Sequence, residues 1–203
     1  MNVPNRLTLL RVLLVPLFLL FMVPVFGDGT FSQFVLSQGG RVIATFIFII
    51  ASLTDLFDGL LARRMGLVSN FGKFLDPIAD KLLVIGGFAA FVELGRVTSF
   101  VLMIIVAREF LVTGIRLLAA ERGVVIAASW FGKIKAVVQM LTLIFLLIEP
   151  FITGSSYSKE AFSSAYVLFT NIMIIATLVL TILSGIDYWY KNRAILSDLI
   201  ENL

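Results

Sequence analysis

Four aspartates lie in the stretch 52–81. Asp55 and Asp58 are three residues apart, and Asp76 and Asp80 are four residues apart. On an α-helix these spacings place each pair on one face, one turn apart. If the short connection between the pairs brings two helices together antiparallel, the four carboxylates converge.

Carboxylates gathered in this way repel one another. Two like charges 4 Å apart cost about 4 kcal/mol at an effective dielectric constant of about 20. The nearby Arg63, Arg64, Lys73 and Lys81 offset part of this cost, but divalent ions offset it more completely because each carries two charges on a compact centre. Carboxylates without histidine or cysteine favour hard ions such as Mg²⁺ or Mn²⁺, and a pair of ions about 3.5–4 Å apart suits phosphoryl displacement.

The alternative is that the aspartates are helix caps or structural ion pairs. Asp76, followed by Pro77, is typical of a helix start. The chain has no cysteine and no histidine, which excludes a disulfide framework, a thiolate metal site and a Ser-His triad. Acid–base or metal chemistry therefore falls to aspartate and glutamate.

The elements that carry these residues have the composition of a membrane protein. Of the 203 residues, 60% are apolar and 14% are charged, against about 45–50% and about 25% in soluble domains. Six stretches are apolar enough for spanning helices. They are expected at residues 7–26, 41–63, 75–94, 98–119, 130–149 and 163–189.

The basic residues predict the orientation of these helices. All 16 except Arg41, Arg96 and Lys159 fall on the side that also holds both termini, and basic residues favour the cytoplasmic side. We therefore predict an all-α polytopic membrane protein with six transmembrane helices and both termini in the cytoplasm. The whole chain, 1–203, is expected to be a single membrane domain.

A second group of charged residues follows the aspartates. Arg108 lies near the middle of the fourth expected helix, beside Glu109, and Arg116 lies about 80° around the same helix. Lys133 and Lys135 begin the fifth helix. An arginine this far from a helix end is costly against lipid, so it should face a polar cavity that suits an anionic, phosphorylated alcohol. The alternative is that Arg108 pairs with Glu109 or an aspartate and that the others are interfacial anchors.

The aspartate stretch resembles the signature of the CDP-alcohol phosphotransferase family. The matching string is Asp55-x-x-Asp58-Gly59-x-x-Ala62-Arg63, eight residues, then Gly72-x-x-x-Asp76-x-x-x-Asp80. The resemblance covers every fixed position and implies an enzyme in which an alcohol attacks a CDP-linked lipid and releases CMP. It also implies two divalent ions as cofactors and a homodimer.

The resemblance assigns a role to each position of the string. Asp55, Asp58 and Asp76 would bind one metal or both, and Asp80 would bind one metal and accept the proton of the incoming hydroxyl. The remaining matched positions would admit and contact the CDP group, with the small residues allowing close approach and the arginine contacting the diphosphate: Gly59, Ala62, Arg63 and Gly72.

Three further segments are similar to the branch of this family that makes phosphatidylglycerol phosphate from sn-glycerol 3-phosphate. They are Asn5-x-x-Thr8-x-x-Arg11, residues 107–116 and residues 132–135. This likeness implies that the acceptor phosphate is bound by Thr8, Arg108, Arg116, Lys133 and Lys135. Asn5 and Arg11 are equally well explained as a helix-start residue and an interfacial cation.

The expected partners are therefore CDP-diacylglycerol, sn-glycerol 3-phosphate and the lipid bilayer, with no nucleic acid. We expect a multi-pass protein of the cell membrane with its active site facing the cytoplasm, and an interfacial aromatic belt formed by residues 188–190. The first alternative is the same chemistry with inositol phosphate, serine or a phospholipid as acceptor. A cation transporter that uses the aspartates as its ion site, or a catalytically inactive homologue, belongs to a different class.

Overall fold

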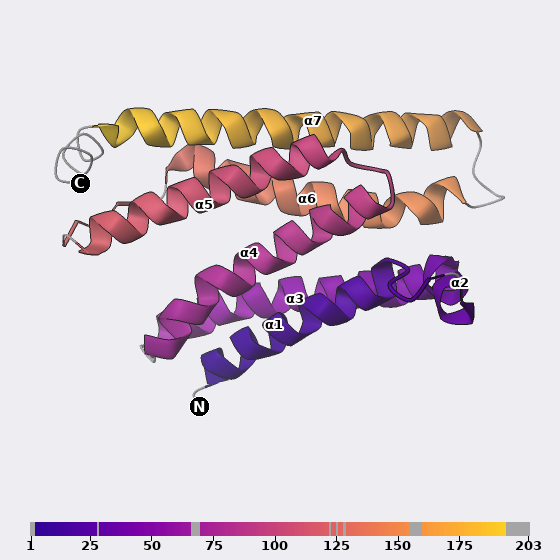
Figure 1. Ribbon diagram of the computed structural model, residues 1–203, viewed down its shortest axis with the longest axis horizontal. Coiled ribbons are helices and arrows are strands. Elements are labelled where there is room, and N and C mark those ends of the chain that lie inside the picture. The colour runs from indigo at the N-terminus through magenta and orange to yellow at the C-terminus, as the bar shows by residue number, and fades with distance from the viewer. Residues whose placement is uncertain are drawn as a thin grey trace. The chain divides into compact units, whose positions relative to one another are not determined.

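The computed structural model describes residues 3–27, 29–65, 70–121, 123–124, 126–127, 129–154 and 160–193. Side chains are described for these residues except 3–6, 55–77, 80, 121 and 161–162. In this part of the chain every regular element is an α-helix (Figure 1). The helices are α1 (Val3–Met22), α2 (Thr30–Leu36), α3 (Gln38–Met65), α4 (Asn70–Glu93), α5 (Ser99–Glu121), α6 (Trp130–Thr153) and α7 (Glu160–Lys191). The predicted all-α class is confirmed.

Each of the six expected apolar stretches is mostly helical, although α1 ends at Met22, before the expected end at residue 26, and α2 is an additional helix. It lies between the first two expected stretches, within residues 27–40, which are rich in glycine, serine and threonine. The chain bends by 67° between α2 and the first part of α3. Gly40 permits this bend, because a Cβ there would lie 2.5 Å from the carbonyl oxygens of Phe34 and Val35.

Two helical stretches in the described part of the chain are long and apolar enough to cross a bilayer, Trp130–Thr153 and Ser163–Lys191. Helix α2 and the adjoining part of α3 add a third candidate if this bent pair is one span. Helix α5 carries charged residues in its interior, among them Arg108, Glu109 and Arg116, which a purely lipid-facing span would avoid. The chain is a membrane protein, whereas the full set of six spans and the cytoplasmic termini stay predictions.

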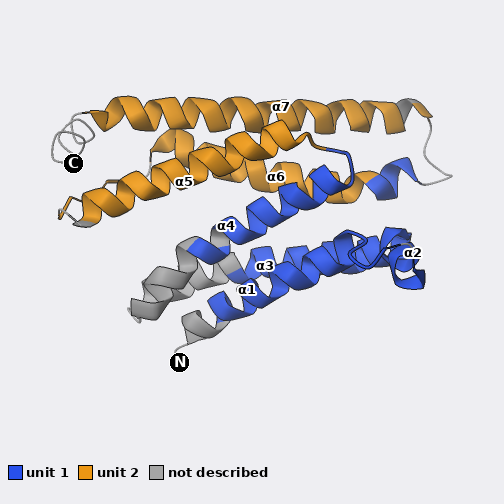
Figure 2. Cartoon of the chain, in the orientation of Figure 1, with its two compact units in different colours: residues 1–96, 150–156 blue, residues 97–149, 157–203 orange. Residues whose placement is uncertain are grey.

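The chain divides into two compact units (Figure 2), residues 1–96 with 150–156 and residues 97–149 with 157–203. In the first unit, α1 packs against both α3 and α4, and α3 also contacts α4. The rings of Phe18 on α1 and Phe48 on α3 are 5.4 Å apart, and both side chains are fully buried. The three helices that carry the aspartate stretch and the N-terminal motif therefore share one core.

In the second unit, a ladder of polar side chains joins α6 to α7. The hydroxyl oxygens of Thr142 and Thr177 are 2.8 Å apart, and Gln139 Nε2 donates to Thr181 Oγ1 at 3.3 Å. Such bonds stabilise pairs of helices where lipid supplies no competing partner. They fix the position of α7, which also packs against α5, so the charged face of α5 meets a defined surface.

Candidate active site

The predicted metal and nucleotide ligands lie on the two helices that the sequence indicated, but their side chains fall outside the described residues. Asp55 and Asp58 belong to α3, and Asp76 and Asp80 belong to α4. The predicted CDP contacts are likewise divided between α3, with Gly59, Ala62 and Arg63, and α4, with Gly72. The geometry that the structure gives for this region is therefore that of the helices.

The described parts of these helices have regular buried faces. On α3, the buried residues Ala44, Phe48 and Ala51 are spaced by four and three residues. The same alternation continues to Asp55 and Asp58, which share this face by helical periodicity. The spacing of the buried residues on α3 therefore extends along the helix to the positions of the first aspartate pair.

Helix α4 shows the same relation between its core and its aspartates. Leu83 and Ala90 are buried on α4, and the steps of three and four residues that connect them continue backwards to Asp80 and Asp76. Helices α3 and α4, which carry the two aspartate pairs, contact each other. The arrangement agrees with the sequence-based expectation of two adjacent helices.

Helix α1 completes this arrangement with a buried cation. Arg11 is 0% exposed, so the interpretation of Arg11 as an interfacial cation is wrong. Helix α1 runs antiparallel to α3 (Figure 1). Seven residues separate Arg11 from Phe18, and seven separate Phe48 from Asp55, which is about 10 Å along each helix. The Phe18–Phe48 contact therefore sets Arg11 at the level of Asp55.

A second contact gives the same level on α4, which runs parallel to α1 (Figure 1). A Cβ added at Gly86 would lie 3.2 Å from Val15 Cγ1 and 3.8 Å from Leu19 Cδ1. Asp80 lies six residues before Gly86 on α4. On α1, Arg11 lies six residues before position 17, which is midway between Val15 and Leu19. Two independent contacts thus set Arg11 level with an aspartate of each pair.

The donor chemistry of this region fits hard divalent cations. All four predicted ligands are carboxylates, which Mg²⁺ and Mn²⁺ prefer. Among the residues whose side chains are described, no group of three or more acidic residues could hold a metal ion. The aspartate stretch therefore has no competing site in the described part of the chain.

The second unit contains a compact cluster of charges formed by Arg108, Glu109 and Lys135. Glu109 Oε1 accepts a hydrogen bond from Arg108 Nη1 at 3.3 Å and also binds Lys135 Nζ. The side chain of Arg108 is 12% exposed, that of Glu109 is 13% exposed and that of Lys135 is 5% exposed. Arg108 Nε donates to Ser184 Oγ of α7 at 3.0 Å. Two of the predicted acceptor-phosphate residues, Arg108 and Lys135, are therefore joined through one carboxylate.

Arg116 lies on the same side of α5, against Tyr188 of α7. Its guanidinium carbon is 5.5 Å from the centre of the tyrosine ring, and its charge repels that of Arg108. Arg116 Nε and the Tyr188 hydroxyl are buried without a hydrogen-bond partner among the described residues. This tyrosine is 2% exposed, so its predicted place in an aromatic belt is wrong, whereas Trp189 and Tyr190 are exposed as expected.

The other two predicted acceptor residues are Lys133 on α6 and Thr8 on α1. Lys133 is exposed, and its ammonium group lies 5.6 Å from the centre of the Trp130 ring, apart from the Glu109 contacts. Thr8 is buried on α1 in the first unit, one turn before Arg11. Within the second unit, the structure thus brings Arg108 and Lys135 together and sets Arg116 beside them, and Lys133 lies outside this cluster.

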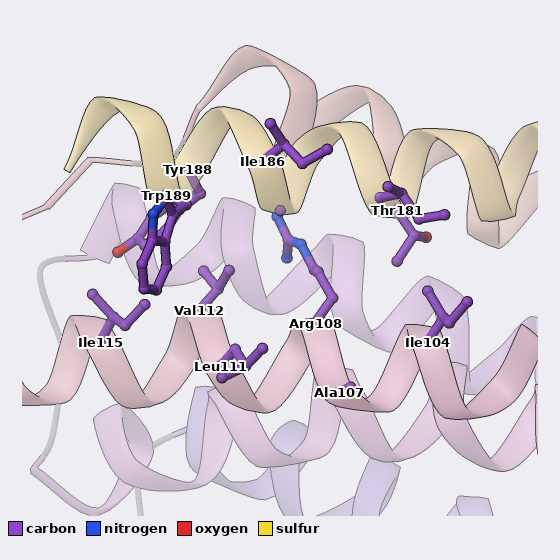
Figure 3. Close-up of a pocket in the computed structure, with 12 residues that line it drawn as sticks. Ile104, Ala107, Arg108, Leu111, Val112, Ile115, Thr181, Ile186, Tyr188 and Trp189 are labelled. Carbon is purple, nitrogen blue, oxygen red and sulfur yellow. The ribbon is translucent and has the colours of Figure 1, made fainter. Parts of the chain in front are cut away.

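A pocket of about 300 Å³ opens between α5 and α7 beside the charge cluster (Figure 3). Arg108 crosses it toward α7, and Tyr188 and Trp189 lie at one end (Figure 3). The remaining walls are almost entirely aliphatic, formed by Ile104, Ala107, Leu111, Val112, Ile115, Ile182 and Ile186. A cationic group at an apolar wall suits an amphiphile with an anionic head.

Sequence reasoning missed two residues of this region. Glu109 was noted only as a partner of Arg108, but it also binds Lys135 from another helix. Tyr188 was assigned to the membrane interface, although it lies under Arg116. The spacing of eight residues on α5 indicated that the two arginines share a face, but no pattern in the sequence gives the partners from α6 and α7.

Comparison with known proteins agrees with the aspartate string. Residues 1–183 match the family described as CDP-alcohol phosphatidyltransferase. The CDP-diacylglycerol–glycerol-3-phosphate 3-phosphatidyltransferase of Bacillus subtilis is 36% identical over 197 residues, which cover 94% of this chain and 95% of that protein. A probable phosphatidylglycerophosphate synthase of Mycobacterium tuberculosis is 39% identical over 187 residues, covering 92% and 79%. The Escherichia coli protein that carries the same name as the Bacillus relative is 40% identical over 154 residues, covering 73% and 78%.

Proposed function

Because the chain belongs to the CDP-alcohol phosphatidyltransferase family, we propose that it transfers the phosphatidyl group of CDP-diacylglycerol to sn-glycerol 3-phosphate and releases CMP. The family predicted from the aspartate string is confirmed, and the chain is a membrane enzyme of phospholipid biosynthesis. The observation that carries the choice of acceptor is the likeness, over nearly the whole chain, to relatives named for glycerol 3-phosphate. The buried cations of α5 and α6 agree with a phosphorylated acceptor.

The aspartates carry the chemistry in this proposal. Enzymes of this family depend on divalent metal ions. Two such ions, Mg²⁺ or Mn²⁺, would be held by Asp55, Asp58, Asp76 and Asp80 and would neutralise charge on the diphosphate and on leaving CMP. Asp80 accepts the proton of the acceptor hydroxyl. The hydroxyl oxygen of the acceptor then attacks the phosphorus that carries the diacylglycerol, and CMP leaves. Arg11 supplies a fixed positive charge from α1 that lowers the cost of keeping four carboxylates in one place.

The other proposed positions bind and orient the two substrates. Gly59, Ala62 and Gly72 leave room for the CDP group, and Arg63 binds its diphosphate. The acceptor phosphate is bound by Thr8, Arg108, Arg116, Lys133 and Lys135. Arginine and lysine suit this role because they give charge-assisted hydrogen bonds to phosphate oxygens.

The cellular setting follows from the same proposal. The enzyme crosses the cell membrane with six helices, both termini lie in the cytoplasm, and the aspartates act at the cytoplasmic side. It acts as a single domain over 1–203 and as a homodimer. The positive-inside distribution of basic residues and the six apolar helices support this orientation.

The direct test measures CMP release by the purified protein in detergent or lipid with CDP-diacylglycerol. We expect release that requires both sn-glycerol 3-phosphate and Mg²⁺ or Mn²⁺, and that stops when the ions are chelated. Inositol phosphate and serine, offered separately, should give no more than background. Release with inositol phosphate but not with glycerol 3-phosphate would refute the proposed acceptor, and no release with any alcohol would refute the transferase activity.

The second test concerns Arg116. Replacing it by alanine removes a half-buried positive charge while leaving the aspartate helices untouched, so the KM for glycerol 3-phosphate should rise about tenfold with little change in kcat. Arg193→Ala is the matched control, because Arg193 also lies over a tyrosine ring, that of Tyr190, at 4.9 Å, but is exposed. An unchanged KM in the Arg116 variant would remove this residue from the acceptor site.

A further inference from the structure

We propose that Glu109 is a positioning residue that holds Arg108 and Lys135 in the geometry that binds the acceptor phosphate, and that it thereby sets the KM for the acceptor. This inference rests on the proposed function. Glu109 does not itself bind the phosphate, because both groups are anionic. It acts through the two cations that share its Oε1 oxygen.

The first support is the shared carboxylate oxygen. Arg108 precedes Glu109 on α5, whereas Lys135 comes from the second turn of α6. One oxygen that accepts from both cations fixes the distance between a guanidinium and an ammonium group on different helices. Because the lysine side chain has four rotatable bonds, this contact removes much of the conformational freedom that phosphate binding would otherwise have to restrict.

The second support is burial. Lys135 is 5% exposed and Arg108 is 12% exposed at the side chain, so water screens their mutual repulsion poorly. A counter-charge is needed in the absence of substrate, and Glu109 provides it. With one negative charge against two positive charges, this group of three residues keeps a net positive charge, which attracts a phosphate.

The third support is the way in which Arg108 is held on its other sides. Its Nε donates to Ser184, its Cγ would lie 3.5 Å from a Cβ at Gly185, and its Nη2 would lie 3.4 Å from a Cβ at Gly132. Nε and Nη1 bond Ser184 and Glu109, and, as far as the described residues go, Nη2 is the nitrogen left to donate to a phosphate oxygen. If the contact with Glu109 were lost, the guanidinium could turn about Nε and present a different edge.

The test is Glu109→Gln, which keeps the shape of the side chain and removes its charge. We expect the KM for glycerol 3-phosphate to rise about tenfold, while kcat and the KM for CDP-diacylglycerol stay within about twofold of the wild type. A role limited to fold stability would lower the amount of active enzyme and leave the acceptor KM unchanged. The ratio of the two KM values therefore separates positioning from stability.

A double-variant cycle shows whether Glu109 acts through Lys135. We expect Lys135→Met to raise the acceptor KM by itself, and adding Glu109→Gln to that variant should raise it by no more than about threefold. If the increase in acceptor KM of the double variant equals the product of the increases of the two single variants, the residues act independently and the proposal is wrong. The double variant also removes both charges of one ion pair, so it provides a measurement if Glu109→Gln alone does not fold.

Glu149→Gln is the matched control. Glu149 is also a buried carboxylate of the second unit, bonded to Thr170, but it lies about 21 Å along α6 from Lys135. The KM of the Glu149→Gln variant for glycerol 3-phosphate should equal that of the wild type. An active wild type with an unchanged acceptor KM in Glu109→Gln overturns the positioning role alone, whereas a wild type that releases no CMP with glycerol 3-phosphate overturns both proposals.

Discussion

Replacing Asp80 by asparagine is expected to slow CMP release by about 1,000-fold or more, with CMP binding nearly unchanged. The amide has almost the same shape as the carboxylate but cannot accept the proton of the glycerol 3-phosphate hydroxyl. In the proposed function the nucleotide is bound mainly by the other aspartates and by the small residues of α3, so it should still bind. The measurements are kcat from CMP release and the dissociation constant of CMP from calorimetry in the presence of Mg²⁺.

A control on the same helix makes this result specific. Glu93 is an exposed carboxylate at the far end of α4, and Glu93→Gln should keep kcat within about twofold of the wild type. Asp80→Asn with normal turnover would refute its assignment as the base. Asp80→Asn with lost turnover and lost CMP binding would show instead that Asp80 is needed chiefly to bind the nucleotide.

The family could be predicted from the aspartate stretch because the information in this stretch is local. The spacings of Asp55 with Asp58 and of Asp76 with Asp80 are properties of single helices, and the small residues between the pairs complete a string that few unrelated chains would contain. The six long helices were likewise predictable from apolar length. Helix α2 was not, because glycine, serine and threonine around it are typical of a connection, and its packing against α3 is a tertiary effect.

The residues that support the two groups of charges could not be assigned from the sequence in the same way. Arg11 lies near a chain end, where a basic residue is usually an interfacial anchor, and only the packing of α1 between α3 and α4 buries it. Tyr188 belongs to a run of three aromatic residues that looks like a membrane belt, but the twist of α7 turns this one residue toward α5. Partners from distant segments decide such cases, and one sequence does not show them.

The buried charge of Arg11 leads to the second large effect. If Arg11 offsets the charge of the aspartates as proposed, Arg11→Met should lower the melting temperature of the protein in a chelating buffer by about 10 °C, because loss of one partner of a buried charge costs about 3–5 kcal/mol. CMP release should also fall strongly. Arg11→Lys, which keeps the charge, should lose much less in both measurements.

Divalent ions provide the decisive comparison for Arg11. If its charge offsets the repulsion among the aspartates, then Mg²⁺ should raise the melting temperature of Arg11→Met more than that of the wild type, because an ion replaces the missing positive charge. Arg41→Met is the control, since Arg41 lies at the opposite end of α3 from the aspartates and should show the same Mg²⁺ shift as the wild type. Equal Mg²⁺ shifts in all three proteins would mean that Arg11 is buried for packing alone, and that the aspartates of α3 and α4 are tolerated without help from α1.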